Sequence, residues 1–339
     1  MKDPRPEGHL ASYIRRRKFL ATLGGAAAWP LAAWAQQAAM PVIGYLDTAS
    51  ASTTAHLVAA FHDGLSAAGY NEGRNVAIEY RWPDGDYDKL PGLAADLVRR
   101  NVAVIATINT PTILAAKAAT KTIPIVFAVG VDPIKFGLVD SLNRPGGNLT
   151  GLTQLNVEME AKRVQLLYEL PPSTTTVALL INPSSPAYSE AATESAQSAA
   201  RVLGIRLLVL NASTPSGIET AFVTLAEERI RSLLVSDDSF LVAQREQLVG
   251  LAARYAVPTL YHRREFTAVG GLMSYGPPLS EAYYHVGNYA GRILKGEKPA
   301  NMPVYQSTKF DLVINLKTAK ALGIQLPPTL LALADEVIE

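Results

Sequence analysis

The sequence predicts an α/β protein built from two doubly wound, parallel-sheet halves. Short apolar runs rich in β-branched residues alternate along the chain with amphipathic stretches of helical period. The apolar runs are continuous rather than alternating, which is typical of strands buried on both faces of a parallel sheet. The pattern restarts after a strong turn signal at 144–148, so we expect two halves of similar build that divide near residue 150.

The first half begins with a buried strand at 41–46 and a helix at 54–68. Leu57, Phe61 and Leu65 share one face of that helix, and Gly69 ends it. Further strands are expected at 76–80, 102–107 and 123–129, and further helices at 90–99 and 111–119. Strands that alternate with helices imply a parallel sheet with right-handed crossovers.

The second half repeats this order. After a strand at 149–152, the expected helices are 157–170, 189–203, 218–228 and 240–255, and the expected strands are 177–181, 206–210, 232–235 and 258–261. An apolar run at 270–275, a helix at 279–295 and a strand at 310–314 come last. Because each half already has most of its strands, these late segments indicate extra crossings between the halves.

The first forty residues have the pattern of an export signal. The basic stretch Arg15-Arg16-Arg17-Lys18 precedes an apolar run at 21–31, and Ala33-Trp34-Ala35 fits a cleavage site of the A-x-A type. Residues 16–20 also fit the twin-arginine pattern, so 1–35 is interpreted as a twin-arginine signal peptide cleaved near Ala35. An uncleaved anchor is the alternative. The leader carries more basic than acidic residues, which leaves the rest of the chain mildly acidic.

Composition excludes several classes of function. The chain has 339 residues with 31 basic and 30 acidic side chains, and this balance argues against a nucleic-acid-binding protein. It has no cysteine, which excludes disulfides, thiolate catalysis, cysteine-type zinc sites and a cysteine-linked lipid anchor. No apolar stretch after the leader is long enough to span a membrane.

Catalytic and metal-binding motifs are absent or incomplete. The sequence has no phosphate-binding loop, dinucleotide fingerprint or H-E-x-x-H motif. The aspartates at 84, 86 and 88 imitate the start of a calcium loop, but Lys89 and Ala95 stand where that loop needs glycine and glutamate. The histidines outside the leader are interpreted as surface residues: His56, His62, His262 and His285. We therefore expect no enzyme activity, no cofactor and no metal site.

Polar side chains follow the expected strands of the first half, at the edge where open α/β sheets bind their ligands. They are Asp47, Thr48, Thr107, Asn109, Thr110, Thr112, Asp132 and Gln154. The exposed N–H groups at the start of the helix at 111–119, together with neighbouring hydroxyls, suit a carboxylate. Ordinary capping of that helix by Thr110 is the alternative, and Asp132 is either a ligand group or the start of a turn.

The second half offers a matching set of polar residues: Asn182, Ser184, Tyr188, Asp237 and Tyr275. Either Asp237 or Asp238 is suited to pair with a ligand ammonium group. The alternative is that one of these carboxylates caps the helix that begins near Phe240. Tyr275 is either a stacking surface for the ligand or an ordinary interface residue.

The chain also resembles a known protein family over nearly its whole length after the leader. The stretches that carry the resemblance are mostly turns, helix ends and core segments: 64–65, 69–76, 79–81, 123–127, 132–133, 137–139, 144–151, 270–276, 293–296 and 313–319. In these stretches the chain resembles the periplasmic substrate-binding proteins of ABC transporters, in the group with tryptophan- and tyrosine-type binding components. Such segments identify the scaffold better than the ligand.

The resemblance implies a type I periplasmic-binding fold, with two flavodoxin-like lobes, three hinge crossings and a ligand in the cleft. Crossings are expected near 150–155, 272–278 and 303–308, with 36–152 plus 276–304 in one lobe and 153–275 plus 305–339 in the other. In relatives that take amino acids, one lobe holds the carboxylate and an acid of the other holds the ammonium. The matching residues here are Thr110, Thr112 and Asp237.

The function implied by the resemblance is that of a periplasmic component of an ABC importer. It would capture a small molecule, such as an aromatic or other amino acid, by hinge closure and deliver it to a permease in the inner membrane. Because no cysteine can carry a lipid, we expect a free, soluble monomer. A ligand sensor for a membrane kinase is the first alternative, since it would share the fold and the leader. A two-lobed α/β enzyme is the second.

Overall fold

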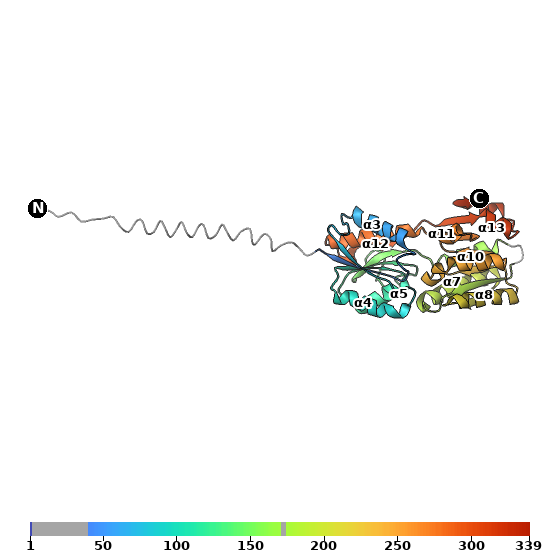
Figure 1. Cartoon of the computed structure of the whole chain (residues 1–339), viewed down its shortest axis with the longest axis horizontal. Helices are drawn as coiled ribbons and strands as arrows, with labels where there is room; N and C mark the ends of the chain where they lie inside the picture. Colours follow the sequence, from blue (N-terminus) through green and yellow to red (C-terminus); the bar gives the residue numbers. More distant parts are fainter. Residues whose placement is uncertain (2–39, 171–173) are drawn as a thin grey trace. The chain divides into compact units, whose positions relative to one another are not determined.

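The computed structural model describes Met1 and residues 40–170 and 174–339. The predicted signal peptide, 1–35, therefore lies outside the described residues except for Met1. Pro41–Glu339 forms one compact unit that contains two α/β lobes, each built on its own sheet (Figure 1). This architecture confirms the predicted fold class. None of the described helices is long and apolar enough to cross a membrane.

Lobe 1 contains a six-stranded sheet in the order β11-β5-β4-β3-β1-β2, and all its neighbouring strands are parallel. The strands are β1 (Val42–Asp47), β2 (Ala77–Arg81), β3 (Val104–Ile108), β4 (Ile125–Val129), β5 (Leu149–Thr153) and β11 (Tyr305–Gln306). The helices are α3 (Ala55–Ala67), α4 (Leu90–Arg99), α5 (Thr110–Ala119) and α12 (Leu279–Leu294), with single 3-10 turns η1 (Tyr87–Lys89) and η2 (Pro299–Asn301). The helices α3 and α12 cover one face of the sheet, and α4 and α5 cover the other (Figure 1).

Lobe 2 contains a seven-stranded sheet in the order β13-β12-β10-β9-β8-β6-β7. The strands are β6 (Thr176–Ile181), β7 (Arg206–Asn211), β8 (Leu233–Val235), β9 (Thr259–Tyr261), β10 (Met273–Gly276), β12 (Asp311–Asn315) and β13 (Glu336–Ile338). The helices are α6 (Glu160–Tyr168), α7 (Pro186–Leu203), α8 (Pro215–Glu227), α9 (Ser239–Ala243), α10 (Arg245–Arg254), α11 (Arg264–Ala268), α13 (Leu316–Ala321) and α14 (Pro328–Ala332). The helix expected at 240–255 is thus two helices, α9 and α10.

Three segments connect the lobes: 154–159 between β5 and α6, 277–278 between β10 and α12, and 307–310 between β11 and β12. The sequence predicted only parallel strands, but β12 is antiparallel to β10, with Gly276 opposite Asp311. The reason is geometric. The chain leaves lobe 2 at the carboxyl end of β10 and returns to the same edge after α12, so β12 must run back along β10.

The last crossing also lies later than the sequence placed it. Residues from 305 onward were expected in the second lobe, whereas Tyr305 and Gln306 pair with Leu152 and Thr153 of lobe 1. This strand of two residues has no apolar pattern of its own. Its position depends on the free edge of β5, which accepts it as the sixth strand of the sheet.

Two glycines allow α3 and α12 to pack closely in lobe 1. A Cβ atom on Gly64 would collide with the backbone oxygen of Tyr284, and one on Gly287 would collide with the backbone oxygen of Phe61. Interiors packed at this density do not absorb such atoms without a shift of the backbone. The close contact holds Tyr283 of α12 beneath the end of β1, where its hydroxyl reaches Asp47. The packing of α12 therefore helps to fix Asp47 at the carboxyl end of β1, on the side of the sheet that faces lobe 2.

Candidate functional site

The loops that follow the strands of both lobes meet around a small cavity of about 20 Å³. Its lobe-1 wall consists of Tyr87, Asn109, Thr110, Pro111 and Gly130. Its lobe-2 wall consists of Ser185, Tyr188, Asp237, Asp238 and Ser239. A cavity of this size holds about one water-sized group. An organic ligand of any size therefore enters this site only when the lobes move apart.

The lobe-1 wall is built on the N-terminus of α5. Asn109 precedes this helix with φ 74° and ψ 152°, a backbone region that glycine adopts almost exclusively. Its side-chain amide donates to Thr48 Oγ1 at 2.8 Å and to Ser239 Oγ of lobe 2 at 3.2 Å. The hydroxyls of Thr48 and Ser239 lie 2.5 Å apart. In the first turn of α5, Pro111 has no N–H and the N–H of Ile113 donates to the backbone oxygen of Asn109. The N–H groups of Thr110 and Thr112 lack partners inside the helix, and together with these hydroxyls they are suited to an anion.

Asp47 stands at the end of β1 but is bound within its own lobe. Its Oδ2 accepts hydrogen bonds from Tyr283 at 2.7 Å and from Tyr45 at 3.1 Å, and its Oδ1 accepts one from the N–H of Ala49. Burial raises the pKa of Asp47, and these donors oppose that rise. The carboxyl group is fully buried and does not line the cavity.

Asp237 of lobe 2 is surrounded by groups that compensate its charge. Its Oδ1 accepts hydrogen bonds from Arg263 Nη2 at 2.7 Å and Nε at 3.0 Å, and His262 Nε2 lies 2.5 Å from the same oxygen. Asn156 Nδ2 donates to Oδ2 at 2.5 Å. Burial alone would raise the pKa of Asp237, but Arg263 and His262 hold that pKa well below its usual range. The carboxylate is therefore ionised, and its charge is already paired within the protein.

Asp238 has a different environment. Its Oδ1 caps α9 by accepting the N–H groups of Phe240 and Leu241, and it also accepts Asn182 Nδ2 at 2.9 Å. Its Oδ2 accepts the hydroxyl of Tyr87 from lobe 1 at 2.9 Å. Burial raises the pKa of Asp238 because, among the described residues, only neutral donors oppose it. Within the part of the chain that the structure describes, this carboxylate lines the cavity with no cation paired to it.

Comparison with known protein families gives a match over most of the chain. The model of the family described as ABC transporter substrate binding protein matches residues 45–338. The chain belongs to this family. It is the substrate-binding protein of an ABC transporter. The members of this family are binding proteins rather than enzymes.

Similar proteins include two solved structures and one curated relative. This substrate-binding protein is 29% identical to a conserved domain protein of Vibrio cholerae O1 biovar El Tor, with a TM-score of 0.80 over 88% of this chain and 99% of that one. It is 27% identical, with a TM-score of 0.79 and the same coverage, to a domain from Streptococcus pneumoniae solved in complex with L-Trp. It is also 27% identical over 266 residues to a tyrosine-binding protein of Clostridioides difficile (strain R20291), covering 78% of this chain and 76% of that one.

The substrate-binding protein brings part of the predicted site set to the cavity. Asn109, Thr110, Tyr188 and Asp237 line it directly. Thr48 and Asn182 lie behind these residues and hydrogen-bond to Ser239 and Asp238. Gln154 is buried in the first crossing, where its backbone N–H donates to the backbone oxygen of Val129.

Other predicted residues have partners elsewhere. Thr107 donates to the backbone oxygen of Val126 inside the sheet, and Thr112 donates to the backbone oxygens of Ile108 and Asn109. Ser184 is exposed, whereas its neighbour Ser185 lines the cavity. Tyr275 stacks on Phe310 with ring centroids 6.1 Å apart, so it acts as an interface residue of lobe 2.

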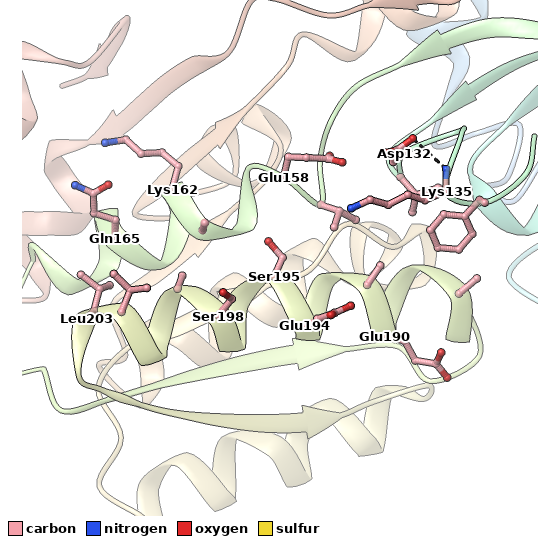
Figure 2. Close-up of a pocket in the computed structure, with 18 residues that line it drawn as sticks. Asp132, Lys135, Glu158, Lys162, Gln165, Glu190, Glu194, Ser195, Ser198 and Leu203 are labelled. Atoms are coloured by element: carbon pink, nitrogen blue, oxygen red, sulfur yellow. Dashed lines mark hydrogen bonds between the residues drawn. The ribbon is translucent and has the colours of Figure 1, made fainter. Parts of the chain in front are cut away.

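Asp132 starts a turn rather than lining the cavity. Its Oδ1 accepts the N–H groups of Ile134 and Lys135 at 2.8 and 3.2 Å. It lies at one end of an open groove of about 1180 Å³ between α6 and α7, where Glu158 of the first crossing and Lys162 on α6 lie across from Ser195 on α7 (Figure 2). This larger groove runs between the two helices and reaches the loop after β4, so Val131 in the groove directly follows Gly130 in the cavity.

Several residues of the site were missed by sequence reasoning. His262 was expected on the surface, but it is only 2% exposed because it packs against Asp237 under the cavity. The signal was available: His262 and Arg263 directly follow the strand β9, as polar residues follow the other strands. Tyr87 comes from the turn η1 and follows no strand directly, so the same rule does not reach it. No group of three or more potential metal ligands occurs among the residues described.

Proposed function

We propose that this protein captures an amino acid with an aromatic side chain between its lobes and delivers it to the permease of an importer. The observation that carries the proposal is the contrast between the two walls of the cavity. The lobe-1 wall has helix N–H groups and hydroxyls and no charged side chain, whereas the lobe-2 wall has two carboxylates. An α-carboxylate suits the first wall and an α-ammonium the second.

We assign the ammonium to Asp238 in preference to Asp237. The sequence left both residues open, and the resemblance pointed to Asp237. Asp237 already has Arg263 and His262 as partners, so a ligand cation would gain little there. The partners of Asp238 among the described residues are neutral, and a ligand ammonium would replace the hydroxyl of Tyr87 as the lobes separate and close again. Charge-assisted hydrogen bonds of this kind are about twice as strong as neutral ones.

Two tyrosine rings support an aromatic side chain. Tyr188 presents its ring to Gly130 so closely that a Cβ atom there would lie 3.1 Å from the ring. Tyr87 contributes a second ring from lobe 1. Aromatic rings of a ligand pack well between such surfaces. The printed names of two similar proteins, one tyrosine-binding and one solved with L-Trp, agree with this choice.

Capture requires hinge motion about the crossings at 154–159, 277–278 and 307–310. The cavity between the touching lobes is too small for an amino acid, so the ligand enters an open form and is enclosed as the lobes close. Ligand then shifts the equilibrium toward the closed form by its contacts to both walls. We further propose that this happens in a periplasm, as a soluble monomer exported by the twin-arginine route and cleaved near Ala35.

Isothermal titration of the purified chain tests the ligand class. We expect binding of L-tryptophan and L-tyrosine. Tryptamine lacks the carboxylate and indole-3-propionate lacks the ammonium, and each should bind about 10- to 100-fold more weakly, because each loses charge-assisted hydrogen bonds. L-Leucine serves as the matched aliphatic control. If no amino acid binds or raises the melting temperature, the proposed ligand class is wrong. N-terminal sequencing of exported chain tests the leader, since it should begin at Gln36.

A further inference from the structure

Arg163 is a fully buried arginine at the hinge, outside the cavity. It lies on α6, the first helix after the first crossing. Its Nη1 donates to the backbone oxygen of Asn156 at 2.8 Å, and its Nε donates to the backbone oxygen of Tyr275 at 2.8 Å. Asn156 belongs to the first crossing, and Tyr275 lies two residues before the second. One guanidinium therefore joins the first crossing to the end of β10, the strand from which the second crossing leaves lobe 2.

The residue held by Arg163 also reaches the cavity. The backbone of Asn156 accepts from Arg163, while its side chain donates to Asp237 in the lobe-2 wall. A chain of hydrogen bonds thus runs from Tyr275 at the end of β10, through Arg163 and Asn156, to Asp237 and Arg263. The preceding residue, Leu155, has φ 53°, which is unfavourable for a leucine. Such strain persists only where the surroundings hold the backbone in place.

The charge of Arg163 is balanced inside the same helix. Oε1 of Glu160 lies 3.4 Å from Arg163 Nη1, and both side chains are 0% exposed. Glu160 also faces Tyr188 on α7 and Asp237 after β8. Burial raises the pKa of Glu160 to about 7, and the arginine opposes that rise. A buried ion pair of this kind contributes little net stability, because desolvation offsets its attraction. Its use must lie in the geometry that it fixes.

We propose that Arg163 is a positioning residue for ligand capture: by tying the first crossing to the end of β10, where the second crossing begins, it fixes the hinge and presents Asp237 in the closed arrangement. This inference rests on the proposed capture of a ligand between the lobes. Arginine suits the role because its rigid fork donates in two directions at once, whereas lysine offers a single point donor on a flexible stem. Without these hydrogen bonds, the ligand-free lobes sample more relative orientations. Closure on the ligand must then restrict this motion, and the lost conformational entropy weakens binding.

Single-molecule energy transfer between the lobes tests the proposal. The chain has no native cysteine, so Asp63→Cys on exposed α3 and Glu227→Cys on exposed α8 give specific labels in lobes 1 and 2. Arg163→Lys should broaden the inter-lobe distribution of the ligand-free protein and weaken L-tryptophan binding about tenfold, through slower closure and faster release. Arg206→Lys, an exposed arginine of the same lobe paired with Glu228, is the matched control and should change neither.

A double variant separates positioning from folding. Arg163→Met with Glu160→Leu replaces the buried pair by apolar side chains of similar volume, a change that is often neutral or stabilising for buried ion pairs. We expect the melting temperature of this variant to match that of the wild type. Its inter-lobe distance distribution should be broader, and its affinity for L-tryptophan should be lower. Wild-type distribution and affinity in this variant would overturn the proposal. If the wild type itself binds none of the amino acids, the proposed function fails instead, and the inter-lobe distribution still tests the hinge.

Discussion

The two walls of the cavity use different physics for the same task. The lobe-1 wall holds its ligand-facing groups by backbone geometry: the N-terminus of α5, a strained Asn109 and uncharged hydroxyls. The lobe-2 wall holds them by charge: Asp237 is paired with Arg263 and contacts His262, and Asp238 caps α9. Strain belongs to one wall and buried ion pairs to the other. Substitutions in lobe 1 should therefore affect backbone energy, and substitutions in lobe 2 should affect charge balance.

The largest effect is expected when the buried pair of lobe 2 is broken. Asp237→Asn keeps the shape of the side chain but leaves Arg263, whose side chain is 10% exposed, without its closest counter-charge. Breaking a buried pair in this way costs about 3 to 5 kcal/mol of unfolding free energy. Urea denaturation followed by circular dichroism measures it. Glu336→Gln, which breaks the exposed pair with Arg264, is the control and should cost less than about 1 kcal/mol. Equal losses in the two variants would remove the charge argument for lobe 2.

A smaller effect, on affinity rather than stability, is expected at Asp238. Asp238→Asn keeps an oxygen that can cap α9 but removes the charge proposed to bind the ligand ammonium. L-Tryptophan should bind about 10- to 100-fold more weakly, because a charged hydrogen bond contributes about 1.5 to 3 kcal/mol. Binding of indole-3-propionate, which lacks the ammonium, should not weaken. Asp132→Asn, in the turn outside the cavity, is the matched control. Unchanged titration of L-tryptophan by Asp238→Asn would show that the ammonium binds elsewhere.

The fold was predictable because strands buried in a parallel sheet have continuous apolar sequences. The strand expected at 102–107 is β3 at Val104–Ile108, and the helix expected at 90–99 is α4 at Leu90–Arg99. The short strand β11 was missed because it depends on the free edge of β5 rather than on its own residues. The direction of β12 was wrong for a similar reason, since it follows from the path of the hinge crossings.

The candidate site was predictable only as far as the strand-end rule reaches. That rule found Asn109, Thr110 and Asp237, which line the cavity. It does not tell which way a side chain points, so it also included Thr107, whose hydroxyl bonds inside the sheet. It missed Arg163, because nothing on an amphipathic helix indicates that one arginine will be buried against the backbone of two distant segments.

The smallest effect is expected at Asn109, and it tests whether the lobe-1 wall is held by strain. Asn109→Ala keeps the unfavourable backbone and loses the hydrogen bonds to Thr48 and Ser239. Asn109→Gly loses the same bonds but relieves the strain, so it should be more stable than the alanine variant by about 1 to 3 kcal/mol. Urea denaturation of both variants measures the difference.

The control for Asn109 is Asn101, which has φ 50° and is exposed. An asparagine tolerates that common left-handed conformation, and alanine there is unfavourable by only about 1 to 2 kcal/mol. The glycine variant should therefore exceed the alanine variant in unfolding free energy by a larger margin at position 109 than at position 101. If the margins are equal, the backbone of Asn109 stores no special strain, and the lobe-1 wall must be held by its hydrogen bonds alone.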